Sequence, residues 1–141
     1  MKTTLLSLSL LSILALGNLS CKKDSDDSEE CEINVATVAG KYKLVSAKFV
    51  NGSTETDALP TLYDACELDD INELKPDKTF VYTDGGTVCT PSGSTSGTWD
   101  ISGMTLILNS GFSVIESFDC TNLVVTYTDG ANTVRETYRK Q

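Results

Sequence analysis

The feature that most constrains the fold is a series of two-residue turn signals spread over the chain from about residue 45 onward. Each pair ends in glycine, which readily adopts the positive φ that tight hairpin turns need. Asparagine or aspartate before glycine gives the strongest signal of this kind. A chain divided in this way favours short antiparallel strands over long helices. The pairs are Asn51-Gly52, Asp84-Gly85, Ser102-Gly103, Ser110-Gly111 and Asp129-Gly130.

The segments between these turns alternate apolar and polar residues, as strands with one buried face do. Met104, Leu106 and Leu108 share one face of their segment, and Phe80 and Tyr82 share one face of another. We also expect a helical turn within 34–39 and a loop, with room for a short helix, over 52–68. The expected strands are 41–50, 71–75, 79–84, 96–101, 104–109, 112–118, 122–128 and 132–139.

Strands of this number and spacing are typical of an all-β barrel or sandwich. Successive hairpins favour the barrel, because closure removes the exposed edges of the sheet. We therefore predict a small antiparallel up-and-down barrel of about eight strands within a domain spanning 36–141. That domain follows a disordered N-terminal tether.

The first twenty residues have the pattern of a secretory signal peptide, 1–20. A short basic start, Met1-Lys2, precedes an apolar run from Leu5 to Leu16 that only serines interrupt. This run is too short to span a bilayer, which takes about 20 apolar residues. The protein is therefore expected to be exported.

The end of the signal peptide, Ser20-Cys21, resembles the lipobox of bacterial lipoproteins. This resemblance implies that Cys21 is acylated and becomes the new N-terminus, which would anchor the protein to a membrane. The family's usual Leu and small residue are replaced here by Asn18 and Leu19. Ordinary secretion, with Cys21 left as a thiol, is the alternative.

Residues 21–35 are expected to form a lipidated acidic tether. Within it, residues 22–30 hold five acids, two bases and no apolar residue, a composition that favours disorder. An acidic cluster at this place resembles the export signal of surface lipoproteins in Bacteroidota. Lys22 follows Cys21, so the aspartate of the inner-membrane retention signal is absent. We expect an outer-membrane lipoprotein, on either the periplasmic face or the cell surface.

Composition excludes several classes of function. The chain carries a net charge of −9, which disfavours binding to nucleic acid. It has no histidine, so it lacks the commonest general base and the commonest metal ligand. The acids at 69–77 lack the spacing of a calcium-binding EF-hand, and hairpin turns account for Asp84 and Asp129. We expect no enzyme activity, no metal and no cofactor.

Four cysteines remain after Cys21: Cys31, Cys66, Cys89 and Cys120. An even number in an exported domain indicates two disulfides, with three pairings open. We favour Cys66–Cys89, which would bridge the ends of a hairpin. The other bond would then be Cys31–Cys120, which would tie the start of the domain to a late turn.

A family resemblance covers roughly residues 36–140. The segment Gly40–Leu44 is similar to the opening strand of lipocalin-type barrels, with Tyr42 in place of the usual tryptophan. The order of later motifs resembles lipocalin-like domains of Bacteroidota lipoproteins. Those motifs are Cys66, Asp69-Asp70, Thr79-Phe80, Asp84-Gly85, Cys89, Gly97-Thr98-Trp99 and Leu106-Ile107-Leu108. The resemblance implies a small barrel that has room for an apolar ligand.

The candidate residues for such a cavity are Tyr42, Phe80, Trp99, Leu106 and Val125, which lie on the apolar faces of their strands. The same side chains can instead simply fill the barrel, because eight strands enclose little space. Two functions therefore remain open. The barrel binds a small apolar or amphipathic ligand, or its outer surface docks a protein or glycan. The sequence does not fix the oligomeric state.

Overall fold

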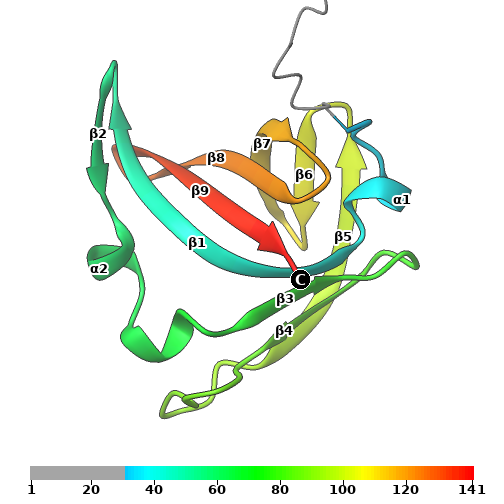
Figure 1. Ribbon diagram of the computed structural model, residues 1–141, viewed down its shortest axis with the longest axis horizontal. Helices are drawn as coiled ribbons and strands as arrows, with labels where there is room; N and C mark the ends of the chain where they lie inside the picture. The colour runs from blue at the N-terminus through cyan, green and yellow to red at the C-terminus, as the bar shows by residue number, and fades with distance from the viewer. Residues whose placement is uncertain (1–30) are drawn as a thin grey trace, which may run out of the picture.

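The computed structural model describes residues 31–141. The predicted signal peptide, the lipid attachment site Cys21 and the tether up to residue 30 lie outside the described residues. Nine antiparallel strands form one sheet that closes on itself (Figure 1). The strands are β1 (Gly40–Asn51), β2 (Thr54–Asp57), β3 (Ile71–Leu74), β4 (Thr79–Thr83), β5 (Thr95–Ser102), β6 (Thr105–Leu108), β7 (Gly111–Phe118), β8 (Asn122–Asp129) and β9 (Asn132–Lys140). The helices are α1 (Val35–Val38), α2 (Leu59–Leu62) and a 3-10 turn, η1 (Ala65–Glu67).

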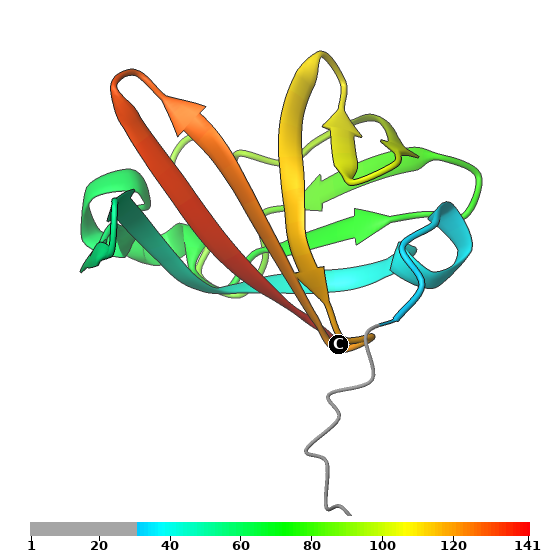
Figure 2. The ribbon, with the colours of Figure 1, turned by 90° about the horizontal axis from the view of Figure 1, so that it is seen from above.

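Eight of the strands, β1 and β3 to β9, form a closed up-and-down barrel, which confirms the predicted fold class. Each strand from β3 to β9 pairs with its neighbour in sequence. The barrel closes where β1 pairs with β9, from Tyr42 opposite Lys140 to Val50 opposite Thr133. Figure 2 shows these first and last strands side by side.

The ninth strand, β2, lies outside the barrel and pairs only with the far end of β1, Lys48–Asn51. It falls within the segment 52–68, for which the sequence predicted a loop. All four of its side chains are exposed, so no apolar alternation marked it as a strand. The same segment also contains α2, which begins with Pro60 in its first turn.

Three of the five glycine pairs that predicted hairpin turns place their glycine in a two-residue hairpin loop. Gly52, Gly103 and Gly130 each have φ near +60° and are the first residue of a two-residue loop. At the β6–β7 turn the positive φ belongs to Asn109, and Gly111 is already part of β7. Met104 lies in the β5–β6 turn and is half exposed, so its predicted place on the inward face with Leu106 is wrong.

The Asp84-Gly85 pair does not form a two-residue hairpin. β4 ends at Thr83 and β5 begins at Thr95, so a long loop separates them. Positive φ occurs at Gly86 instead. The interpretation of Asp84 as a simple turn residue is therefore wrong, and its buried carboxylate has another role, described below.

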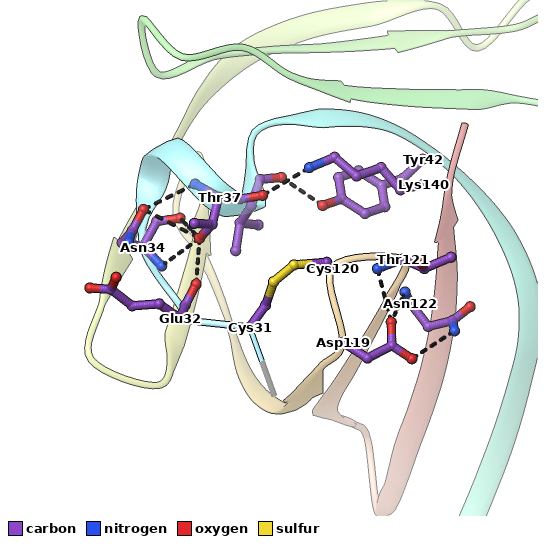
Figure 3. The surroundings of a disulfide bond; sticks show 11 residues. Cys31, Glu32, Asn34, Thr37, Tyr42, Asp119, Cys120, Thr121, Asn122 and Lys140 are labelled. Carbon is purple, nitrogen blue, oxygen red and sulfur yellow. Dashed lines mark hydrogen bonds between the residues drawn. A yellow bond between two sulfur atoms is a disulfide. The ribbon is translucent and has the colours of Figure 1, made fainter. Parts of the chain in front are cut away.

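The structure pairs Cys31 with Cys120 and Cys66 with Cys89, the pairing favoured above, with Cα atoms 5.3 Å and 5.4 Å apart. Figure 3 shows the first bond, which joins the start of the described chain to the β7–β8 turn. The Cys31 amide also donates to the carbonyl oxygen of Phe118 at 3.0 Å. Residues 31–35, which the sequence assigned to the tether, therefore pack against the barrel.

Helix α1 covers one part of the barrel core. Asn34 caps it by accepting a hydrogen bond from the Thr37 amide at 3.0 Å. The Tyr42 hydroxyl donates to the carbonyl oxygen of Val38 at 2.6 Å, which ties the helix to β1 (Figure 3). Lys140 donates to the Thr37 carbonyl oxygen and lies over the ring of Tyr42. No helix within residues 31–141 is long and apolar enough to cross a membrane.

Candidate functional site

The barrel interior has a filled part and a hollow part. In the filled part, large side chains are fully buried, among them Trp99, Phe118 and Ile115. The Trp99 indole N–H donates to the Lys75 carbonyl oxygen at 2.8 Å, which ties the side chain to the β3–β4 turn. This part of the interior is packed core.

The hollow part is a cavity of about 60 Å³. Most of its surface is an apolar wall, made of Leu74, Phe80, Leu106, Leu108, Leu123 and Val125. The rest includes a polar corner, made of Glu136 and the Tyr138 hydroxyl bonded to it, and two further polar residues, Asn72 and Ser113. An apolar pocket with a few converging polar groups is the usual form of a small-molecule site. The cavity is well below the roughly 300–1,000 Å³ of pockets for drug-sized ligands.

Four of the five predicted cavity residues line this space: Tyr42, Phe80, Leu106 and Val125. The fifth, Trp99, does not line it and lies 1 % exposed in the packed core. Its neighbour across the β5–β6 pair, Leu108, contributes to the apolar wall instead. The alternation of apolar and polar residues therefore predicted the lining of the cavity correctly except at Trp99.

The polar corner centres on Glu136, which the sequence analysis did not single out. Glu136 is only 3 % exposed. In the sheet it is paired with Val125 of β8 on one side and Ala47 of β1 on the other. The carboxylate accepts hydrogen bonds from three tyrosine hydroxyls, of Tyr63, Tyr127 and Tyr138. The available signal was the alternation in β9, which places Glu136 on the same face as buried Val134.

The three tyrosines come from different parts of the chain. Tyr138 and Tyr127 project from β9 and β8, and their hydroxyl oxygens lie 2.7 Å and 2.8 Å from the carboxylate. Tyr63 directly follows α2, a segment held against β1 by the Ala58 amide, which donates to the Ala47 carbonyl oxygen at 2.9 Å. The polar β2–α2 excursion therefore serves to bring a third hydroxyl to Glu136.

The tyrosine hydroxyls stay protonated in this setting. Burial raises the pKa of Tyr138 well above its ordinary value, and the Glu136 carboxylate raises that pKa further. Burial also raises the pKa values of Tyr63 and Tyr127, with Glu136 adding to both. All three therefore act as hydrogen-bond donors over the physiological pH range.

A second cavity, of about 170 Å³, lies between η1 and the β4–β5 loop. Its lining includes four carboxylates, of Asp64, Glu67, Asp70 and Asp84, and the Cys66–Cys89 bond links its two sides. Within residues 31–141, no group of three or more such side chains is placed to hold a metal ion.

The buried carboxylates of this second cavity organise the loop. Asp84 accepts hydrogen bonds from the backbone amides of Gly93 and Cys89, at 2.9 Å and 3.1 Å. These bonds, led by the Gly93 amide, hold the pKa of Asp84 below its usual range. Asp70 accepts from the Gly85 amide at 3.0 Å and from the Tyr82 hydroxyl. The irregular loop has no strand partner for these backbone amides. The two carboxylates accept the hydrogen bonds that water would otherwise accept.

Three of the exposed large apolar residues within residues 31–141 lie on or next to the β6–β7 hairpin, and Val45 and Val88 are exposed elsewhere. Phe112 and Val114 point outward from β7 and are 68 % and 54 % exposed. Met104, in the adjoining turn, is 49 % exposed, and its carbonyl oxygen accepts from the Ile115 amide. Scattered apolar residues are normal on protein surfaces, but contiguous ones can mark a contact site.

Comparison with known proteins gave one match. A family model described as a lipocalin-like domain matches residues 38–139. Neither the comparison with curated proteins nor that with solved structures gave a match.

Proposed function

Because the chain belongs to the lipocalin-like domain family, we propose that it is an exported lipoprotein whose barrel binds a small amphipathic ligand in its interior. The observation that carries the proposal is the cavity, which an apolar wall and the polar corner around Glu136 line together. A ligand with an apolar body and one polar group matches both parts. The lipocalin-like fold typically serves binding rather than catalysis.

The size of the cavity limits the ligand. About 60 Å³ does not hold a fatty acid or another long-chain lipid unless side chains move. Four-carbon amphiphiles are therefore the appropriate probes: butylammonium, butanol and butyrate carry the same apolar body and differ only in the polar group. We expect at least one of them to shift the amide NMR signals around Phe80 and Val125 saturably.

Filling the cavity is expected to weaken this binding. Ser113 lines the cavity and is partly buried. Ser113→Leu places extra carbon atoms in the cavity, so we expect the affinity of the best probe to fall about tenfold or more, at a stability cost of roughly 1–3 kcal/mol. Ser117→Leu, on an exposed position of the same strand, is the matched control and should bind like the parent chain. Unchanged binding by the Ser113 variant would place the ligand elsewhere.

Attachment to a membrane is the second part of the proposal. The two disulfides support an extracellular or periplasmic location. The apolar run and Ser20-Cys21 support acylation at Cys21, and several acyl chains give stable anchoring where a single chain gives marginal anchoring. The anchor would hold the barrel at the outer membrane, on its periplasmic or its outer face.

Replacing Cys21 with serine tests the anchor. We expect Cys21→Ser to move the protein from the membrane fraction to the soluble fraction, because serine cannot take the thioether-linked lipid. Cell fractionation followed by immunoblotting measures the distribution, and intact mass measures the lipid itself. Cys120→Ser, which alters a cysteine of the barrel, should leave the protein in the membrane fraction. A Cys21 variant that stays membrane-bound would show that the anchor lies elsewhere.

The alternative is that the protein docks a protein or glycan through its outer surface. Exposed Phe112 and Val114 on β7 favour this second function. The probe experiment separates the two, because a barrel that serves only as a docking scaffold binds none of the three amphiphiles.

A further inference from the structure

Glu136 is a buried carboxylate that no cation of the described chain neutralises. The ion pairs of residues 31–141 involve Glu55, Asp100 and Glu116, all on the outside of the barrel, and none involves Glu136. Burying an unpaired charge is costly unless hydrogen bonds compensate. Three tyrosine hydroxyls supply those bonds here. The barrel interior therefore holds an acidic side chain whose donors are all neutral and which has no cationic partner within residues 31–141.

The hydrogen bonds leave part of this carboxylate open. An ionised carboxylate offers about four acceptor positions, two on each oxygen. Oε1 of Glu136 accepts from both Tyr63 and Tyr127, so its positions are used. Oε2 accepts only from Tyr138 among the described residues, which leaves one position without a protein donor. Because Glu136 lines the cavity, a ligand in the cavity can supply the missing donor.

We propose that the ligand of the barrel is a small amine, whose protonated nitrogen binds Oε2 of Glu136 while its apolar body lies against Phe80, Leu106 and Val125. This inference rests on the proposed binding function and names the chemical class of the ligand. A protonated amine supplies both the missing donor and the missing positive charge. A hydrogen bond between charged groups is roughly twice as strong as one between neutral groups.

The same charge excludes other ligands. A carboxylate ligand would place a second negative charge beside Glu136, which is unfavourable in a buried setting. An alcohol can donate to Oε2 but leaves the charge uncompensated. The net charge of −9 on the whole chain also attracts cations over anions. The arrangement therefore selects amines over acids most strongly and over alcohols to a smaller extent.

The three four-carbon probes test this selection directly on the full chain. At neutral pH we expect butylammonium to bind about tenfold or more tightly than butanol, and butyrate to show no saturable binding. Equal or tighter binding of butanol or butyrate would overturn the amine assignment while leaving interior binding in place. If none of the three binds saturably, the proposed function fails and the assignment fails with it.

Removing the charge gives an independent test. Glu136→Gln keeps the shape of the side chain and one acceptor oxygen but is neutral, so butylammonium should lose its advantage over butanol. Glu116→Gln is the matched control: Glu116 lies on the outer face, where it pairs with Arg135, and its variant should keep the parent preference. A folded Glu136→Gln chain that still prefers butylammonium would overturn the inference. If the Glu136→Gln variant does not fold, the comparison of the three probes on the parent chain still tests the inference.

Discussion

Replacing Trp99 with alanine is expected to lower the free energy of unfolding by about 3–5 kcal/mol, the usual cost of removing a large aromatic side chain from a core. Trp99 is 1 % exposed and packs in the main core cluster with Tyr42 and Phe118. The substitution leaves a void among these side chains. It also leaves the Lys75 carbonyl oxygen without the indole donor, 2.8 Å away in the parent.

Urea unfolding followed by far-ultraviolet circular dichroism measures this change, because Trp99 is the single tryptophan and its fluorescence disappears in the variant. Phe112→Ala is the matched control. Phe112 is 68 % exposed on the outside of β7, so its loss should change stability by no more than about 0.5 kcal/mol. If the two variants lose similar, small amounts of stability, Trp99 is not part of the packed core.

Loss of the Cys31–Cys120 disulfide should be more damaging than loss of Cys66–Cys89. The first closes a loop of 89 residues and the second a loop of 23. A disulfide lowers the entropy of the unfolded chain, and this effect grows with loop length. It predicts a stabilisation of about 4–5 kcal/mol for the longer loop and about 3 kcal/mol for the shorter. We therefore expect the Cys31→Ser, Cys120→Ser double variant to unfold at lower urea than the Cys66→Ser, Cys89→Ser double variant.

Peptide mapping without reduction must first show that each double variant keeps its other disulfide, and that the parent links Cys31 to Cys120 and Cys66 to Cys89. The reduced parent chain serves as the lower limit of stability. The reverse order of stability would mean that native contacts, and not loop length, decide the contribution of each bond. A parent chain with four free thiols in the oxidising compartment would contradict both disulfides.

The barrel strands were predictable because they carry two signals that agree. β8 and β9 alternate apolar and polar residues, and the glycine of their hairpin, Gly130, has the positive φ that the turn requires. β2 carries neither apolar alternation nor a burial pattern, because it adds to the outer end of β1 with both faces in solvent. A strand that buries nothing leaves no mark in the hydrophobic pattern.

The site was only partly predictable from the sequence, because some of its residues are far apart along the chain. Phe80, Leu106 and Val125 were identified because each lies on the apolar face of its own strand. Glu136 was missed because its role depends on Tyr63, which is 73 residues away. The contact with Tyr63 leaves no local pattern, and the alternation in β9 that places Glu136 inward is outweighed by the ordinary expectation that an acidic residue in a strand faces solvent.

The pairing of β1 with β9 also decides when this protein can become folded. The two strands that close the barrel come from opposite ends of the domain, so the ring stays open until the last strand has left the ribosome or the export channel. Closure of such distant contacts is slow compared with the formation of local hairpins. A chain cut short before Asn132 presents the bare edges of β1 and β8, and edges of this kind recruit strands from other chains. Truncated or stalled copies should therefore collect as aggregates or be degraded, because the barrel cannot close without β9.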